Sequence, residues 1–286
     1  MADTEKKIKS NRTVMKSLRR SPLAMFGLFI VILLVLCAIF SDVIAPFPYA
    51  KQNLMNAFEA PSSAHWFGTD EFGRDIFSRV VYGSRISLFV GFIAVGIAIV
   101  FGGSLGAIAG YYGGRADNII MRVMDVLLSI PSTVLAISIA AALGPGLFNL
   151  MVAVGISATP AYARVMRGSV LSVRGQEFVE AAKAVGSSDI RIILKHIIPN
   201  CMGPVIVQST LGVANAILSA AALSFIGLGI QPPVPEWGAM LSGARAYIRD
   251  YSYMTLFPGL AVMVTIMALN FLGDGLRDAL DPKLKR

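Results

Sequence analysis

The chain has 286 residues, of which 55% are hydrophobic and only 15% are charged, and its mean hydropathy is +0.68. These values lie far from those of a soluble globular domain, so the bilayer is the first solvent to consider. The net charge of +8 would suit nucleic acid, but the chain shows no nucleic-acid-binding motif, and we expect no such partner. Two cysteines, Cys37 and Cys201, provide neither a disulfide framework nor a metal-binding spacing.

Six apolar stretches are candidates for membrane-crossing helices. They are residues 23–40, 88–110, 123–143, 147–163, 202–228 and 255–272. About 20 apolar residues suffice to cross the hydrocarbon core as a helix. Basic residues precede the first stretch as in a secretory signal, but its apolar run is too long for one, and we interpret it as uncleaved. The fourth is the weakest, because it contains Pro160 and several polar residues, which neighbouring helices can accommodate.

The distribution of positive charge predicts the topology. If the N-terminus is cytoplasmic, 19 of the 25 Lys and Arg residues fall in cytoplasmic segments. The positive-inside rule therefore favours an all-α membrane protein with six spans and both termini in the cytoplasm. We expect three parts: residues 1–85, with the N-terminal cytoplasmic segment, the first span and an external loop; residues 86–276, the main membrane domain; and residues 277–286, a cytoplasmic tail.

The inner loop between the fourth and fifth spans predicts a helical hairpin. In its first helix Phe178, Ala182 and Val185 share one apolar stripe, and Gly186 ends the helix. A second short helix follows, which we expect to stop at Pro199. A partner that pushes on such a hairpin would move the spans as a rigid body. The alternative, a loop that lies at the lipid interface, remains open from periodicity alone.

Within this loop, at about residues 173–200, the chain resembles the EAA loop of ABC importer permeases. The match consists of Glu180-Ala181-Ala182, Gly186 and Pro199 at the family's spacing, while His196 and Ile198 depart from its letters. The resemblance implies that this loop is a coupling helix that docks in a groove of a cytoplasmic ATPase. For Glu180 the alternative is a solvated helix face.

Three further segments resemble the peptide and nickel branch of these permeases. They are residues 68–88, with a GTD-x-x-GRD-x-x-SR pattern, residues 231–238, with the sequence QPPVPEWG, and residues 273–282. The first is an external stretch of alternating acids and bases, for which we expect a structural role, as a salt-bridged cap on the helices. The resemblance covers residues 22–282 and is greatest with the second permease subunit of dipeptide importers; relatives for oligopeptides, glutathione and nickel share the motifs.

Polar residues inside the fifth stretch are candidates for the translocation pathway. Gln208, Asn215 and Ser219 follow one another at helical spacing. They either line a hydrophilic path or act as hydrogen-bonding contacts between helices. Gly102, Gly106 and Gly110 form a small-residue ridge that is typical of close helix packing.

The chain shows no phosphate-binding loop and no hydrolase motif, so we do not expect an enzyme or a bound cofactor. The resemblance implies that ATP and Mg²⁺ are bound by partner ATPase subunits. A secondary transporter, independent of ATP, is the rival class, but no span carries a central Asp or Glu. A membrane enzyme ranks third.

The sequence therefore predicts a type I ABC importer permease in a bacterial cytoplasmic membrane, embedded in lipid, that imports di- and oligopeptides. The resemblance implies a homologous second permease subunit, two ABC ATPases and an extracytoplasmic substrate-binding protein as partners. ATPase closure would turn the path from inward-facing to outward-facing. Glutathione or nickel is the alternative cargo.

Overall fold

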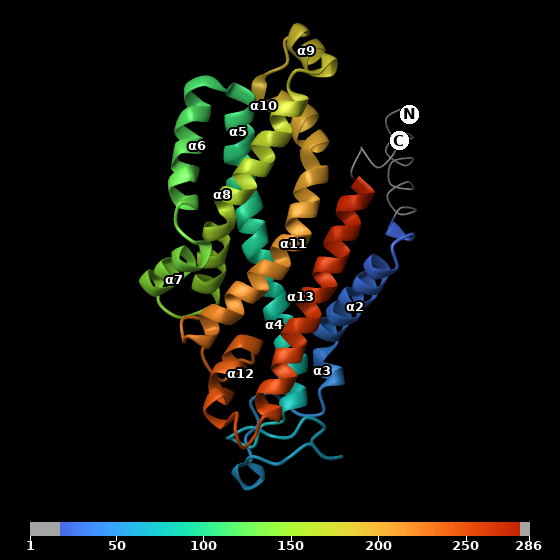
Figure 1. Cartoon of the computed structure of the whole chain (residues 1–286), viewed down its shortest axis with the longest axis vertical. Helices are drawn as coiled ribbons and strands as arrows, with labels where there is room; N and C mark the ends of the chain where they lie inside the picture. Colours follow the sequence, from blue (N-terminus) through green and yellow to red (C-terminus); the bar gives the residue numbers. More distant parts are fainter. Residues whose placement is uncertain (1–17, 281–286) are drawn as a thin grey trace.

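The structure is a computed structural model that describes residues 18–280, and this part of the chain is built from helices joined by short loops and one long one. Figure 1 shows them as an elongated bundle. The α-helices are α2 (Pro22–Ile39), α3 (Ser41–Ile44), α4 (Ile76–Ala98), α5 (Ser104–Tyr112), α6 (Gly114–Leu128), α7 (Ser132–Leu143), α8 (Leu147–Val173), α9 (Glu177–Ala184), α10 (Asp189–Ile192), α11 (Ile198–Phe225), α12 (Trp237–Ala244) and α13 (Tyr253–Leu280). Two short 3₁₀ helices, η1 (Leu54–Asn56) and η4 (Arg245–Tyr247), and two π-helical turns, η2 (Ile99–Gly103) and η3 (Ile193–Ile197), complete the set.

Two pairs of α-helices are continuous rods. Helices α4 and α5 join through η2 into one helix, Ile76–Tyr112, and α10 and α11 join through η3 into Asp189–Phe225; each has 37 residues. At 1.5 Å per residue such a helix is about 55 Å long. A bilayer with its headgroups is roughly 40–45 Å thick, so both rods extend beyond it.

Four described helices are long and apolar enough to cross a membrane: Pro22–Ile39, Ile76–Tyr112, Asp189–Phe225 and Tyr253–Leu280. The pair α6 and α7 could supply a fifth span, but its two parts meet at 89°. The stretch at 147–163 lies within α8, a helix that is not among these candidates. The count of six therefore stays a prediction.

The apolar stretch at residues 123–143, expected as one membrane-crossing helix, is broken into two helices, α6 and α7. The chain leaves the helical path at residues 129–131, between α6 and α7. Pro131 has no amide hydrogen to donate, and its ring disfavours helical geometry at Ile130, so the helix ends there and a new one begins.

The glycine ridge packs closely against α8. A Cβ atom on Gly102 would lie 2.3 Å from the carbonyl oxygen of Thr159, and one on Gly106 would lie 2.2 Å from that of Ala163. Only residues without a side chain allow the two backbones to approach this far. The packing interpretation of the ridge is confirmed, and it fixes α5 against α8.

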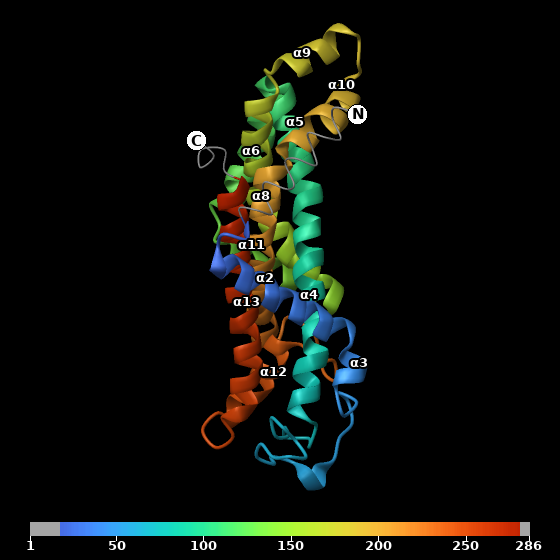
Figure 2. The ribbon, with the colours of Figure 1, turned by 90° about the vertical axis from the view of Figure 1, so that its right-hand side faces the viewer.

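The two ends of the bundle carry different structures. Helices α9 and α10 project at one end, whereas the long loop at residues 45–75 covers the other (Figures 1 and 2). Helices α6 and α7 form one flank, and α2 lies against α13 on the other. Figure 2 shows that α2 crosses α4 obliquely. The hairpin of α9 and α10 and the loop at residues 45–75 are therefore separated by the length of the rods.

Candidate functional site

The hairpin at residues 177–197, predicted to couple to an ATPase and called the coupling hairpin below, is held to the bundle by its own small core. Val179 and Ala182 of α9 are buried and pack with Ile192 and Ile197. Phe178 and Val185 are exposed, Val185 by 80%. The buried stripe therefore differs from the predicted one of Phe178, Ala182 and Val185. Ala182 is buried as predicted, but its buried partner is Val179, because residues three apart share the face that meets the bundle.

The glutamate and the alanine that open the EAA motif lie on the free face of α9. Glu180 and Ala181 are exposed, and the backbone amide of Glu180 donates a 3.3 Å hydrogen bond to Gln176 O. A small side chain beside a carboxylate offers a surface that another protein can approach closely. Ala182, in contrast, supports the hairpin from within.

Gly186 closes the helix in the conformation that its position predicts. Its φ is +76°, in the left-handed region, and its amide donates to Lys183 O at 2.9 Å while the amide of Ser187 donates to Ala182 O at 3.1 Å. This pattern is the usual glycine-terminated helix end. No atom lies within 4 Å of the place where a Cβ would stand, so backbone conformation, not space, requires glycine.

The prediction that Pro199 stops the second helix is wrong. The helix continues through Pro199 into α11, with the proline exposed in the first turn of that helix. The π-turn η3 immediately precedes it. A π-turn shifts the hydrogen-bond register, and the missing proline amide is thereby accommodated without a break.

A second set of contacts joins the hairpin to the end of α5, and the end of α5 to the end of α8. The hydroxyl group of Tyr111 donates to Oδ1 of Asp189 at 2.7 Å, and Nζ of Lys183 lies 5.4 Å from the centre of the Tyr111 ring. Arg174 donates from Nη1 to Gly110 O at 2.8 Å. The residue pattern held no signal for these roles, since each depends on a partner distant in sequence.

Ion pairs tie α6 to α8 nearby. Arg167 holds Asp117 in a two-pronged contact, with Nε to Oδ1 at 2.5 Å and Nη2 to Oδ2 at 2.6 Å. Arg164 donates to Asp125 at 2.7 Å. A guanidinium group matches a carboxylate in this fork geometry, which fixes direction as well as distance.

The three candidate pathway residues lie on α11 but in different surroundings. Gln208 is partly buried, and its backbone carbonyl accepts a 3.2 Å hydrogen bond from the Tyr162 hydroxyl. Asn215 is exposed. Ser219 lines a cavity of about 110 Å³ with Thr133 of α7. The fold thus brings Ser219 to α7 and places Gln208 in a contact between helices.

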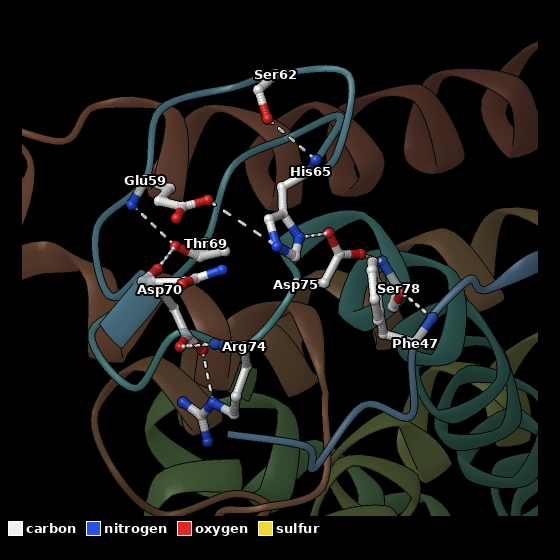
Figure 3. Close-up of polar contacts among 10 residues, drawn as sticks. Phe47, Glu59, Ser62, His65, Thr69, Asp70, Arg74, Asp75 and Ser78 are labelled. Atoms are coloured by element: carbon white, nitrogen blue, oxygen red, sulfur yellow. Dashed lines mark hydrogen bonds and ion pairs between the residues drawn. The ribbon is translucent and has the colours of Figure 1, made fainter. Parts of the chain in front are cut away.

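The predicted external cap, within residues 68–88, is built on buried charges (Figure 3). Asp70 accepts from Nε of Arg74 at 2.6 Å and from the backbone amides of Phe72 and Arg74, both at 3.0 Å. Arg79 lies 3.6 Å from the same carboxylate and donates to Tyr49 O at 3.0 Å. These side chains are all buried, so the predicted salt-bridged cap is confirmed as a packed one.

A second carboxylate starts α4. Asp75 caps the helix by accepting from the amide of Ser78 at 2.7 Å, and its other oxygen lies 2.9 Å from Nδ1 of His65. Ser78 in turn accepts from the amide of Phe47 at 3.1 Å. Figure 3 shows this chain of contacts running from the loop into the first turn of α4.

The QPPVPEWG segment at residues 231–238, predicted to be external, is anchored by Trp237 and Glu236. Trp237 is buried and donates from Nε1 to Val80 O at 3.0 Å. Glu236 accepts from the amides of Gly238 and Ala239, both at 2.9 Å, and so caps α12. Burial raises the pKa of Glu236, while these hydrogen bonds and the neighbouring hydroxyl of Ser224 oppose the rise.

Comparison with protein families identifies two matching regions. Residues 102–286 match the family described as binding-protein-dependent transport system inner membrane component. Residues 11–61 match the N-terminal TM domain of oligopeptide transport permease C. The first match covers more than half of the chain and includes the coupling hairpin.

Several curated proteins are similar over almost the whole chain. The dipeptide transport system permease protein DppC of Alkalihalophilus pseudofirmus is 51% identical over 96% of this chain and 90% of that protein. The probable D,D-dipeptide transport system permease protein DdpC of Escherichia coli is 48% identical, over 93% and 89%. The glutathione transport system permease protein GsiD of Escherichia coli is 48% identical, over 93% and 88%.

Solved structures share the fold. An inward-facing MetNI methionine ABC transporter chain superposes with a TM-score of 0.57 at 18% identity, covering 71% of this chain and 96% of that one. A chain of an amino acid ABC transporter superposes with a TM-score of 0.53 at 15% identity, covering 70% and 94%. At such identities the likeness concerns the fold alone, which is that of a type I ABC importer permease.

Proposed function

Because this chain belongs to the family of binding-protein-dependent transport system inner membrane components, we propose that it is one of two permease subunits of an importer for di- and oligopeptides. Proteins of this family are multi-pass transport components of the inner membrane and are not enzymes. The assignment of the cargo rests on one observation, the 51% identity to a dipeptide permease over 96% of the chain. The glutathione permease at 48% identity supports the second candidate cargo, a γ-linked peptide.

The coupling hairpin would receive force from a cytoplasmic ABC ATPase, which binds ATP and Mg²⁺. Its free face, with Glu180 and Ala181, supports docking, and its buried face ties it to α8 and α11. Gly186 sets the turn, and Pro199 leads directly into α11. Movement of the hairpin would therefore pass into two helices at once.

The orientation follows from the same assignment. If an ATPase docks on α9, the end with α9 and α10 is cytoplasmic, and the cap at residues 45–75 faces outward toward a substrate-binding protein. The six-span count, the cytoplasmic termini and the parts 1–85, 86–276 and 277–286 agree with the charge distribution. Among the candidate pathway residues Gln208, Asn215 and Ser219, the exposed Asn215 would lie toward a homologous second permease subunit.

Uptake of labelled cargo into proteoliposomes tests this proposal. The complex would be purified with its partner subunits, and uptake of dipeptides, glutathione and nickel would be measured with and without ATP. Glu180→Arg is expected to abolish ATP-dependent dipeptide uptake, and Glu177→Arg, at another exposed glutamate three residues earlier on α9, shows whether the effect is specific to the motif position. Uptake that ignores both ATP and Glu180→Arg would instead favour an ATP-independent secondary transporter.

A further inference from the structure

A buried carboxyl group lies where α4, α11 and α12 meet, toward the end of the bundle opposite the coupling hairpin (Figure 1). Glu236 is 1% exposed and directly precedes α12. Each of its two carboxyl oxygens accepts one backbone amide of α12, from Gly238 and from Ala239. Burying a carboxylate costs free energy unless hydrogen bonds surround it, so the other groups around Glu236 decide how tightly it holds a proton.

Two buried hydroxyl groups, one from each neighbouring helix, complete the surroundings of this carboxyl group. Ser87 of α4 and Ser224 of α11 are 2% and 3% exposed. Both lie close enough to Glu236 to lower the pKa of its carboxyl group. Within residues 18–280, however, neither hydroxyl group is in full hydrogen-bond geometry with any partner. Both are therefore free to orient toward Glu236.

A serine hydroxyl group can serve either protonation state of a carboxyl group. It donates to a carboxylate, and it accepts from a protonated carboxylic acid. Burial favours the protonated form of Glu236 and outweighs the hydrogen bonds that favour the ionised form. Glu236 can therefore gain or lose a proton without a change of partners, and the balance depends on how well water is excluded.

Close packing on two sides excludes water from Glu236. A Cβ atom on Gly238 would collide with the carbonyl oxygen of Ala221 on α11, and one on Gly83 of α4 would lie 2.9 Å from Nε1 of Trp237. Ala221 and Gly83 each lie one turn before the serine of their own helix, so α12 is fitted against the two helix faces that carry the hydroxyl groups. Any motion that separates α12 from either helix admits water to the carboxyl group.

The ionisable side chains of the helices packed around Glu236 are engaged elsewhere. On α4, Arg79 pairs with Asp70 and Arg85 pairs with Asp42. The outer half of α11 and all of α12 carry no ionisable side chain. Tyr253, at the start of α13, packs against the external loop. The proton on Glu236 therefore depends on the fit of α12 and on the two hydroxyl groups.

We propose that Glu236, Ser87 and Ser224 form a protonation-sensitive clasp that holds α12 against α4 and α11 and keeps the outer end of the chain closed. That this end is the outer one rests on the proposed function, because the orientation follows from an ATPase at the hairpin.

The sign of the pH effect follows from burial. In the clasped state the pKa of Glu236 is raised above its ordinary value of 4.5, and water around an opened clasp would return it toward that value. The clasp is therefore strongest below pH 4.5 and weakens as the pH rises through the pKa of the clasped state. One proton changes the ratio of clasped to open molecules by at most about tenfold per pH unit.

Hydrogen–deuterium exchange tests the clasp. The complete complex would be studied in lipid nanodiscs, without nucleotide or cargo. The readout is the protection of peptides that contain the amides of Gly238 and Ala239, corrected at each pH for the intrinsic exchange rate. We expect this protection to fall in the parent complex as the pH rises from 4.5 toward alkaline values, and to stay constant with pH in Glu236→Gln, which cannot ionise.

Serine variants separate the clasp from a purely structural contact. Ser224→Ala and Ser87→Ala each remove a group that lowers the pKa of Glu236, so the fall in protection should shift to higher pH. Ser242→Ala is the matched control, because this serine lies on α12 but donates to Phe225 O, and it should cause no shift. The clasp is overturned if corrected protection in the parent does not vary with pH, or if Ser224→Ala and Ser242→Ala behave alike.

Uptake tests whether the clasp acts at the outer end. In proteoliposomes with ATP and a fixed pH inside, acidifying the outer solution should reduce uptake by more in the parent than in Glu236→Gln. Equal reductions would overturn the role of the clasp in closing that end. Uptake that ignores ATP in every variant would remove the proposed function, whereas the exchange result needs neither ATP nor cargo and would still decide whether the clasp exists.

Discussion

The Tyr111 hydroxyl donates a 2.7 Å hydrogen bond to Asp189, which joins the end of α5 to the first turn of α10. Both residues lie at the base of the coupling hairpin, and the Tyr111 ring also contacts Lys183. A hairpin braced in this way moves with α5 as well as with α8 and α11. Removing this hydrogen bond therefore tests whether movement of the hairpin is transmitted to α5.

Tyr111→Phe removes this hydrogen bond and keeps the ring. We expect a loss of about 1 kcal/mol of local stability, the usual contribution of one hydrogen bond. The hairpin would then move with less effect on α5, so the number of ATP molecules hydrolysed per peptide imported should rise severalfold. Lys183→Gln, which removes only the charge over the ring, is expected to change this ratio less.

Gly186→Ala places a side chain on a residue with a φ of +76°. The left-handed conformation costs a non-glycine residue about 1–2 kcal/mol, and no neighbouring atom adds a clash. We expect reduced ATP-dependent uptake with normal membrane insertion. Gly175→Ala is the matched control, because Gly175 also has open space around it but no positive φ. Equal uptake in the two variants would show that the turn conformation is unimportant.

Gly106→Ala tests the packing of α5 on α8. Its Cβ would lie 2.2 Å from the Ala163 carbonyl oxygen, so the two backbones must separate, and overpacking of this kind costs about 1–3 kcal/mol. We expect a lower melting temperature of the purified complex. Gly96→Ala, on the same continuous helix but with no atom within 4 Å, should leave the melting temperature unchanged or raise it.

Glu236 predicts a pH dependence of stability. Its pKa is raised above the ordinary value of 4.5, so the folded chain keeps this proton more tightly than the unfolded chain does. Stability should therefore fall as pH rises from about 4.5 through the folded pKa. Melting curves across this range should show that slope in the parent complex and a weaker one in Glu236→Gln, which cannot ionise.

The pattern of apolar residues predicted most helices, because helices in lipid must satisfy their own backbone and so leave long apolar runs. The first span, predicted at 23–40, is α2 at Pro22–Ile39. Hydropathy alone missed the break before Pro131, although the proline itself is a readable signal. The same rule predicted that Pro199 ends a helix, but the helix continues there, because a π-turn next to the proline accommodates its missing amide hydrogen. A proline in the sequence therefore does not by itself show whether a helix breaks or continues, because the packing of the surrounding helices decides between the two.

The candidate site was predicted where its residues are consecutive and missed where they are distant. Gly186 ends α9 as its position in the motif suggested. The stripe on α9 was displaced because one residue of register decides whether Phe178 or Val179 meets the bundle. The bracing residues Tyr111 and Arg174 lie on other helices, and their partners become known only once the chain is folded.

The long helix Asp189–Phe225 has one further consequence. About two thirds of the way along it, Gly212 lies so close to Tyr162 that a Cβ would stand 2.1 Å from the tyrosine oxygen, so the helix is in close contact with α8 at this point. If the helix tilts about this contact, the arm to Asp189 is about 35 Å long and the arm to Phe225 about 20 Å. A tilt of about five degrees would then move the two ends by roughly 3 Å and 2 Å in opposite directions. The end of the helix at the hairpin and the end at Phe225 are therefore linked by one rigid-body motion.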